Sequence, residues 1–175
     1  FYGSIRLYRN HGDGTFGDLT KACGLSSSQW STSAAFGDFD RDGDLDLYVV
    51  NYVVAPWDSI RPCDHGQSAG TGNSSTCRPT DYAAAQDSIW ENRGDGTFVE
   101  RTSSSGIVAA DGKGLAVIVE DFNNDGWPDI YVANDMTPNH LFQNLGQSTK
   151  SGDSPFSFQE RGVPAGAALN GQGEA

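Results

Sequence analysis

The sequence has few basic residues and no long apolar run. Of its 175 residues, 11 are Lys or Arg and 23 are Asp or Glu, so the formal net charge is −12. Proteins that bind nucleic acids present basic patches to phosphates, so we expect no DNA or RNA partner. The longest apolar runs, such as Leu115 to Val119, have the length of a strand. A membrane span needs roughly 20 apolar residues, so we expect no membrane insertion by this segment.

Cysteine is also scarce, with three residues in the chain. Cys63 and Cys77 lie in one polar segment rich in Gly and Ser, and neither belongs to a C-x-x-C pair, so a zinc site is not expected. A disulfide between them would close a loop and contribute about 3 kcal/mol. That bridge implies an oxidising compartment, whereas the alternative is two unpaired thiols. Cys23 is left over, and we expect a small buried apolar residue there.

Catalytic motifs are missing as well. The chain has no H-E-x-x-H or G-x-S-x-G pattern and no phosphate-binding loop, and His11, His65 and His140 are scattered. We therefore expect no catalytic residues, no bound organic cofactor and no enzyme. The many carboxylates are better explained as metal ligands.

The chain contains internal repeats. An acidic unit from Ser33 to Asn51 returns from Ala116 to Asn134. A second unit, which ends in Gly-Asp-Gly-Thr-Phe, runs from Leu7 to Phe16 and returns from Ile89 to Phe98. A weaker third copy begins at Leu141 and resumes at Phe156 or Phe158. Such self-similarity is typical of repeat architectures.

Each unit has a readable secondary structure. Alternation from Leu45 to Val50 predicts a half-buried strand, and the apolar run from Ala116 to Val119 predicts a strand buried on both faces. The turns Gly12-Asp13-Gly14 and Gly94-Asp95-Gly96 suit tight hairpins. An acidic unit and a Gly-Asp-Gly unit therefore make a four-stranded antiparallel sheet. A helical turn is expected between Pro79 and Gln86, and no long amphipathic helix is expected.

A four-stranded sheet repeated along a chain is the unit of a β-propeller, so we predict an all-β fold that is a fragment of a propeller. The alternative is a small open sheet domain. The expected divisions are the outer half of a blade (1–31), a blade with a disulfide-containing insertion at 53–87 (32–102), a second blade (103–161) and the start of the next blade (162–175).

The two acidic loops have the pattern of calcium sites. Ca²⁺ takes several oxygen ligands, and a tight loop supplies them when carboxylates alternate around a glycine turn. In the first loop the expected ligands are Asp38, Asp40, Asp42, Asp44 through its carbonyl, and Asp46. In the second loop they are Asp121, Asn123, Asp125, Trp127 through its carbonyl, and Asp129. The neutral Asn123 predicts weaker binding at the second site.

Two other interpretations of these loops remain open. An EF-hand loop also begins D-x-D-x-D-G, but it needs a Glu at position 12. That position is Val49 in the first loop and Val132 in the second, and no helix is expected beside either loop. The remaining alternative is an acidic turn without a metal.

The acidic unit, which begins Phe36-Gly-Asp-Phe-Asp-Arg-Asp-Gly, resembles the FG-GAP or VCBS repeat that forms the blades of integrin-α-type propellers. The Leu7 to Phe16 unit and the Cys-containing insertion look closer to bacterial relatives of cartilage acidic protein. The resemblance implies a seven-bladed propeller, Ca²⁺ in the blade loops, and a secreted, periplasmic or cell-surface location. This chain departs from the pattern at Asn123, in the third hairpin and in its length.

These observations predict a calcium-binding interaction or adhesion module. The expected partner is a protein or glycan, bound through the inter-blade loops and the 53–87 insertion. A structural accessory subunit of a larger extracytoplasmic or membrane-associated complex is the alternative. An enzyme whose active site lies elsewhere in the protein is less favoured.

Overall fold

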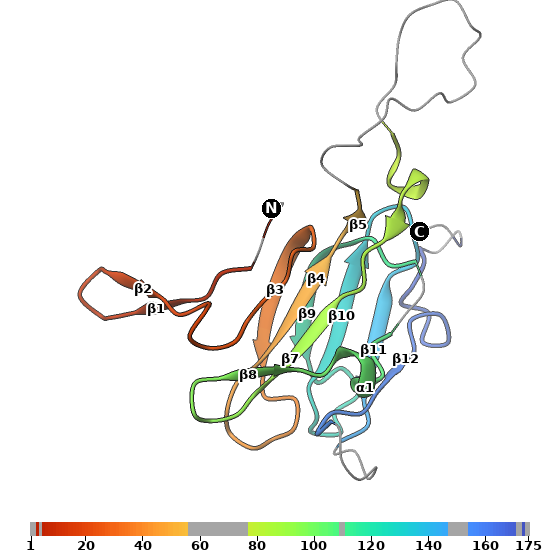
Figure 1. The fold of residues 1–175 in the computed structure, drawn as a ribbon. Coiled ribbons are helices and arrows are strands. Elements are labelled where there is room, and N and C mark those ends of the chain that lie inside the picture. The colour runs from red at the N-terminus through yellow and green to blue at the C-terminus, as the bar shows by residue number, and fades with distance from the viewer. Residues whose placement is uncertain are drawn as a thin grey trace, which may run out of the picture.

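A computed structural model describes residues 3, 5–55, 77–108, 111–146, 154–170 and 173. Two antiparallel sheets of four strands each dominate it, with the strand orders β3-β4-β7-β8 and β9-β10-β11-β12 (Figure 1). Within the described ranges, helical structure is limited to two short segments. The all-β class and the four-stranded antiparallel sheets expected of propeller blades are confirmed, and no closed ring of blades is seen in this part of the chain.

The first sheet combines an acidic unit with a Gly-Asp-Gly unit, as predicted. Its strands are β3 (Ser31–Gly37), β4 (Asp46–Asn51), β7 (Ser88–Asn92) and β8 (Phe98–Glu100). The acidic loop joins β3 to β4, and the Gly-Asp-Gly turn joins β7 to β8. The insertion lies between β4 and β7, which pair directly.

The second sheet has the same strand order along the chain. Its strands are β9 (Gly114–Glu120), β10 (Asp129–Asn134), β11 (His140–Asn144) and β12 (Phe158–Glu160). The third hairpin resumes at Phe158, one of the two positions that the sequence indicated.

Two smaller strand pairs accompany the sheets. The first hairpin pairs β1 (Tyr8–Asn10) with β2 (Phe16–Asp18). The base of the insertion pairs β5 (Val53–Val54) with β6 (Ala83–Ala84).

The helical segments are short. The predicted helical turn is the 3-10 helix η2 (Pro79–Asp81). The one-turn helix α1 (Thr102–Ser105) was not predicted from the sequence. It follows β8 and ends at Gly106, whose φ of 89° lies in the left-handed region that glycine tolerates. The division of the chain into blades at 1–31, 32–102, 103–161 and 162–175 remains a proposal.

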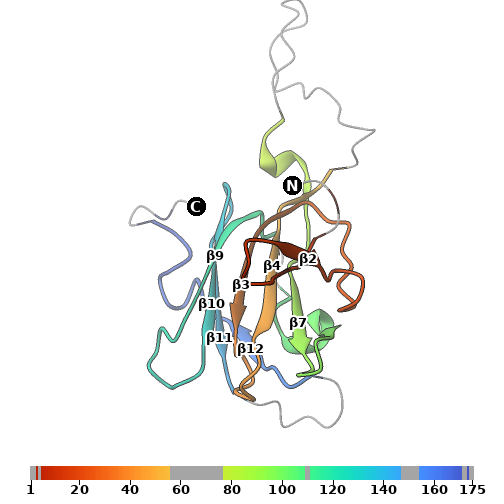
Figure 2. The same ribbon diagram turned by 90° about the vertical axis from the view of Figure 1, so that its left-hand side faces the viewer.

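The main core lies between the two sheets, which stack face to face (Figure 2). Tyr48 and Val50 from β4 meet Ile130 and Val132 from β10, and aromatic residues from the second sheet close the cluster. A second cluster on the other face of the first sheet contains Leu47, Val49, Trp90, Cys23 and Leu25. The described part of the chain therefore has three layers, which are the N-terminal segment, the first sheet and the second sheet.

This layering overturns two burial expectations. The strand β4 was predicted to be half-buried, but all six of its residues are buried because clusters cover both of its faces. The strand β9 was predicted to be buried on both faces, but Leu115 is 47% exposed and Ile118 is 57% exposed. It is an edge strand, and only Val117 and Val119 pack against the core.

A groove of about 440 Å³ opens beside the second cluster. Its apolar lining comes from the N-terminal segment, β3 and β4, and polar side chains lie beside it. The apolar residues are Ile5, Leu7, Leu25, Ala34, Phe36, Leu47 and Val49, and the polar ones are Arg6, Ser31, Thr32 and Ser33. The described residues of the N-terminal segment therefore cover this face of the first sheet only in part.

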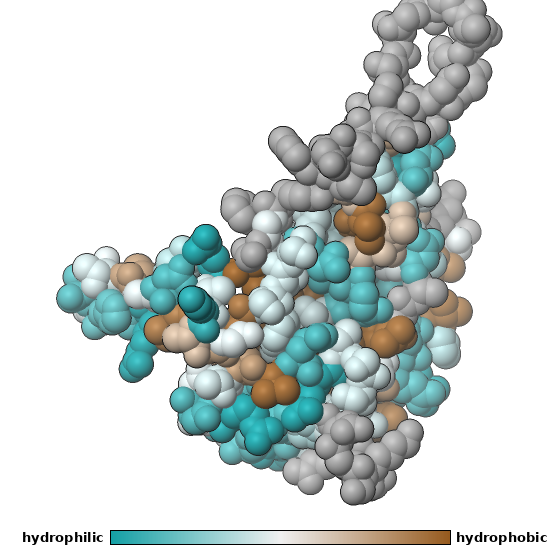
Figure 3. All heavy atoms as spheres, in the orientation of Figure 1, coloured by the Kyte–Doolittle hydropathy of each residue, from teal (hydrophilic) through white to brown (hydrophobic). Residues whose placement is uncertain are grey.

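The acidic loops and the insertion lie at opposite ends of the sheets. In Figure 1 both acidic loops are at the lower end, whereas β5 and β6 mark the upper end. Hydrophilic residues gather at the lower end around the β3–β4 and β7–β8 turns, and a hydrophobic spot lies at the level of β5 (Figure 3). The two ends of the sheets therefore differ in polarity.

The described cysteines occupy different environments. Cys23 is free and buried, as expected, and its thiol lies 3.4 Å from the carbonyl oxygen of Thr20. Cys77 is disulfide-bonded. Its predicted partner Cys63 lies outside the described residues, so that pairing remains a prediction. In the part of the chain that the structure describes, no helix has the length and apolar character to cross a membrane.

Candidate metal centre

The first acidic loop brings three predicted ligands together. Arg41 (φ 60°) and Gly43 (φ 97°) both adopt left-handed conformations, which tighten the turn between β3 and β4. One carboxylate oxygen from each of Asp38, Asp40 and Asp42 lies within 4.8 Å of the others. Three carboxylate oxygens at this spacing can supply part of the shell of about 6–8 oxygens that Ca²⁺ takes.

Backbone amides hold the three carboxylates in place. Asp40 Oδ1 accepts from the amide of Asp42 at 3.2 Å, and Asp42 Oδ1 accepts from the amide of Asp44 at 2.9 Å. Asp38 Oδ2 accepts from the amide of Gly43 at 3.2 Å. These bonds use one oxygen of each carboxylate.

Asp38 Oδ1 is buried and has no hydrogen-bond partner within the described residues. A buried acceptor left without a partner costs about 1–3 kcal/mol. A cation coordinated by Asp38, Asp40 and Asp42 would remove that cost, so the first loop fits Ca²⁺.

The charge distribution in this loop points the same way. Burial and, to a smaller extent, the neighbouring carboxylates of Asp42 and Asp38 together raise the pKa of Asp40 to about 6. Like charges held this close destabilise each other in the ionised state. A bound divalent cation would neutralise this repulsion and stabilise the ionised form.

The predicted ligand Asp46 also has a structural role that the sequence did not reveal. Its carboxylate is buried, where it accepts from the amide of Phe39 at 3.0 Å and from the amide of Asn92 at 2.9 Å. Burial raises its pKa to about 7. Asp46 therefore joins the acidic loop to β7, and its predicted ligation remains a prediction, as does that of the Asp44 carbonyl.

The second acidic loop, between β9 and β10, has the same backbone plan. Gly126 and Asp125 donate their amides to Asp121 at 2.8 and 3.1 Å. Trp127 donates its amide to Asp125 Oδ1 at 2.9 Å. Asn124 adopts the left-handed conformation, with a φ of 58°, at the place that Arg41 takes in the first loop.

The donor set of the second loop is different. Asn123 Nδ2 donates to Asp125 Oδ2 at 2.8 Å, so an amide occupies the place that a carboxylate has in the first loop. Within the described ranges, the cluster of three acidic groups at ligand spacing occurs in the first loop. The weaker binding expected of the second loop remains a prediction.

Asp129 repeats the structural role of Asp46. Its carboxylate accepts from the amide of Phe122 at 3.2 Å and from the amide of Asn144 at 2.8 Å. Burial raises its pKa. In both sheets, the last aspartate of the acidic loop therefore links that loop to the third strand.

Sequence reasoning missed the asparagines that receive these links. Asn92 donates its side-chain amide to the carbonyl of Leu45, and Asn144 donates to the carbonyl of Pro128. Each also accepts the amide of the glycine two positions later. The sequence did carry a signal for these asparagines, because the Leu7 to Phe16 unit has an asparagine, Asn10, at the same place. In the structure Asn10 likewise accepts the amide of the glycine two positions later.

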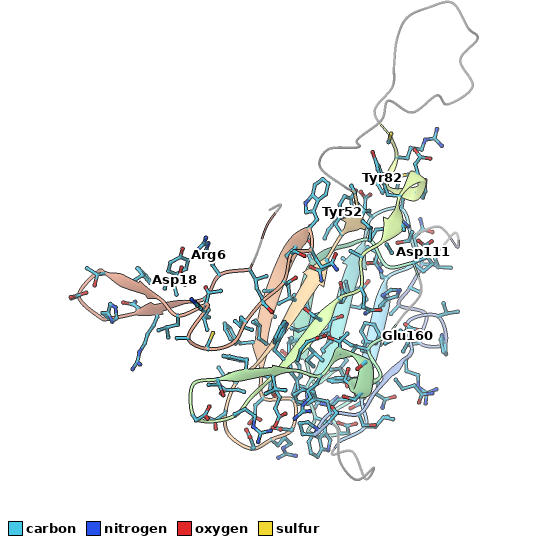
Figure 4. All side chains as sticks on the ribbon, in the orientation of Figure 1. Arg6, Asp18, Tyr52, Tyr82, Asp111 and Glu160 are labelled. Carbon is cyan, nitrogen blue, oxygen red and sulfur yellow. The ribbon has the colours of Figure 1, made fainter. Side chains whose placement is uncertain are left out.

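Aromatic residues form a contact at the opposite end. Trp30 and Tyr52 meet edge to face with ring centroids 5.4 Å apart. The Tyr52 hydroxyl donates to Asp135 Oδ2 at 2.6 Å, which connects the link between β4 and β5 to the loop after β10. Burial and this bond raise the pKa of Tyr52 to about 12. Figure 4 shows Tyr52 at this upper end of the molecule.

Exposed apolar side chains lie close to Tyr52 and Asp135 along the chain. Val54 is 50% exposed and Met136 is 52% exposed, and Met136 adopts a left-handed conformation with a φ of 55°. A non-glycine residue in this conformation is uncommon and occurs often at functional sites. We call Trp30, Tyr52, Val54, Asp135 and Met136 the upper surface. Residues 56–76 of the insertion lie outside the described residues.

Comparison with known proteins agrees with the architecture. The model of the FG-GAP-like repeat matches residues 1–49 and 80–132. Cartilage acidic protein 1 of Xenopus tropicalis is 34% identical over 77 residues, which cover 44% of this chain and 12% of that protein. Cartilage acidic protein 1 of Homo sapiens is 41% identical over 54 residues, which cover 31% of this chain and 8% of that protein. The matched parts are thus a small share of both relatives.

Proposed function

We propose that this chain, which belongs to the FG-GAP-like repeat family, is a calcium-stabilised propeller segment that serves as an interaction or adhesion module outside the cytoplasm. The family match and the four-stranded sheets support the propeller. The disulfide bond of Cys77 supports an oxidising compartment. The relatives named cartilage acidic protein 1 support an extracellular setting.

The calcium site rests chiefly on the first acidic loop. Three aspartates converge there, and Asp38 Oδ1 is buried without a partner in the described part of the chain. Asp38, Asp40 and Asp42 would hold Ca²⁺ with their side chains. Calcium supplies positive charge, and the loop supplies a turn that its backbone amides already hold in shape.

Calcium in this position stabilises the fold. The loop connects β3 to β4, and its last aspartate bonds to β7, so three of the four strands of the first sheet meet at the loop. Metal binding to the folded state therefore adds to the free energy of unfolding.

The upper surface is our candidate for partner binding. Its exposed Val54 belongs to the base of the insertion, and the Tyr52–Asp135 bond joins the residue before β5 to the loop that carries the exposed Met136. Aromatic residues and Met are enriched at protein interfaces. We favour a protein partner on these grounds, and a glycan remains the alternative.

Thermal unfolding of the full-length protein with Ca²⁺ and with a chelator tests the calcium proposal. At a Ca²⁺ concentration 100 times the Kd, one site adds about 2.7 kcal/mol to the free energy of unfolding. For a domain of this size, that stabilisation raises the Tm by about 5–10 °C. Asp42→Asn should lose most of the calcium-dependent increase.

The matched control is Asp13→Asn. Asp13 lies in the Gly-Asp-Gly turn of the first hairpin, where it bonds to Thr15, and it belongs to neither acidic loop. This variant should keep the full response to calcium. A wild-type Tm that does not change on chelation, with no metal in the purified protein, would exclude structural calcium.

A structural accessory subunit is the second candidate, and the apolar groove beside β3 and β4 favours it. Large uncovered apolar surfaces are typical of chains that pack against further protein. Substitutions on the upper surface separate the two functions. An interaction module loses its partner when Met136 is replaced by Asp, whereas an accessory subunit that docks through the groove keeps its place in the complex.

A further inference from the structure

An arginine of the first acidic loop reaches the second loop. The guanidinium carbon of Arg41 lies 5.3 Å from the ring centroid of Trp127, which is a cation–π distance. The same side chain covers the turn of the second loop, because a Cβ added at Gly126 would lie 3.2 Å from Arg41 Nη1. Arg41 sits between the candidate ligands Asp40 and Asp42, and Trp127 is itself a predicted ligand through its carbonyl.

A second, buried contact joins the same two loops. Asn144 Nδ2 donates to the carbonyl of Phe39 in the first loop at 2.9 Å and to the carbonyl of Pro128 in the second loop at 3.1 Å. The backbone amide of Asn144 donates to Asp129 Oδ1. One residue therefore bonds to both loops, and it is fully buried.

Asn144 also forms a hydrogen bond outside its own sheet. Asn92, the equivalent residue of the first sheet, donates its side-chain amide to Leu45 of its own acidic loop. Asn144 makes the equivalent bond to Pro128 and adds the bond to Phe39 of the neighbouring sheet. The extra bond crosses the boundary between the two sheets.

We propose that Arg41 and Asn144 are positioning residues that couple the two acidic loops, so that cation binding in the first loop strengthens cation binding in the second. This inference rests on the proposed calcium function. A cation held by Asp40 and Asp42 restrains the backbone on both sides of Arg41. The restrained arginine orients Trp127, and Asn144 holds the adjoining carbonyls of both loops. Such coupling is reciprocal by thermodynamic necessity.

A purely electrostatic role for Arg41 would have the opposite sign. A positive guanidinium near the second loop repels a cation, so its removal would tighten binding there. Positioning predicts weaker binding after removal, because the second loop loses a contact that orders it. The direction of the change in affinity therefore separates the two roles.

The test uses Tb³⁺ as the probe and the full-length protein. Tb³⁺ replaces Ca²⁺ at oxygen sites, and a nearby tryptophan sensitises its luminescence. Because Trp127 also contacts Arg41 of the first loop, the second loop is reported by the part of the Trp127-dependent signal that Asp121→Asn/Asp125→Asn abolishes. We expect Asp38→Asn/Asp42→Asn, which disables the first loop, to raise the Kd of the second loop by about 5-fold or more. Arg41→Gln should raise it as well, although it removes no ligand.

Two arginine controls accompany these variants. Arg6→Gln removes the same charge from an exposed ion pair with Asp18, far along the chain from either loop, and should leave the Kd unchanged. Arg41→Lys keeps the charge without the planar group and should give an intermediate Kd. Unfolding midpoints in chelator show that each variant is folded before its Kd is compared.

Failure of the inference differs from failure of the calcium function. If Tb³⁺ binds both loops but the second Kd is unchanged in Asp38→Asn/Asp42→Asn, the loops are independent and the coupling is wrong. Tighter binding in Arg41→Gln would also overturn it. If Tb³⁺ gives no Trp127-dependent signal and Ca²⁺ does not stabilise the protein, the calcium function itself fails.

Discussion

At the residue scale, Asp46 and Asp129 show how one carboxylate joins separate strands. Each is buried, and each accepts two backbone amides, one from its own acidic loop and one from the third strand of its sheet. A buried amide that loses its acceptor pays the full cost of its desolvation. These aspartates therefore contribute to stability before any metal binds.

This role predicts that Asp46→Ala destabilises the protein even in the presence of a chelator. The substitution leaves the amides of Phe39 and Asn92 without an acceptor, so the free energy of unfolding should fall by about 2 kcal/mol or more. Denaturant unfolding in chelator measures the loss. Asp42→Asn is the control, because its side chain is exposed and asparagine keeps the Oδ1 acceptor, so this variant should lose no stability in chelator. Equal stability of both variants in chelator would contradict the structural role of Asp46.

At the scale of elements, Asp87 fixes the strand β4 at the point where the insertion returns to the sheet. Its carboxylate accepts from the Tyr48 hydroxyl at 2.8 Å and from the amide of Asn51 at 2.7 Å. Burial raises the pKa of Asp87 to about 6 from its ordinary 3.8, although both hydrogen bonds oppose the shift. The Asp87 carboxylate is therefore easier to protonate in the folded protein than in the unfolded protein.

The raised pKa predicts a pH dependence of stability. Between pH 3.8 and about 6 the folded state binds more protons than the unfolded state at Asp87. The contribution of Asp87 is therefore fully present below pH 3.8 and is lost as the pH rises through about 6. A shift of about 2 pH units corresponds to about 3 kcal/mol.

Denaturant unfolding of the wild type and Asp87→Asn across this pH range, both in chelator, isolates the effect. Relative to Asp87→Asn, the free energy of unfolding of the wild type should fall as the pH rises through about 6. A difference that stays constant from pH 4 to 7 would show that Asp87 titrates normally in the folded protein.

At the scale of the whole molecule, acidic charge dominates. The formal net charge is −12, and the acidic loops lie at one end of both sheets (Figure 1). Self-repulsion of this kind destabilises a compact state, and salt screens it over about 10 Å at 0.1 M. Bound calcium would neutralise part of the same charge.

We therefore expect salt to stabilise the calcium-free protein more than the calcium-loaded protein. The measurement is the Tm at low and moderate NaCl, with chelator or with saturating Ca²⁺. KCl should give the same result, because the effect is screening and not binding of a particular ion. An equal salt response in both states would show that the acidic loops contribute little to the repulsion.

Local sequence patterns determined much of this protein. The repeated units predicted both four-stranded sheets, because a tight turn between two alternating strands leaves few other arrangements. The spacing of Asp38, Asp40 and Asp42 also predicted their convergence, since alternate residues of a tight loop direct their side chains to one point. The convergence of the aspartates and the hairpins depend only on neighbours along the chain, whereas the pairing of β4 with β7 joins strands on either side of the insertion.

Only the tertiary structure decided burial and the contacts between repeats. The burial of β4 and the exposure of β9 depend on which layers cover them, and residues distant in sequence supply those layers. The Arg41–Trp127 contact and the bond from Asn144 to Phe39 arise because the second sheet stacks on the first. A local pattern carries no information about that stacking, so it could show two acidic loops but not the contacts between them.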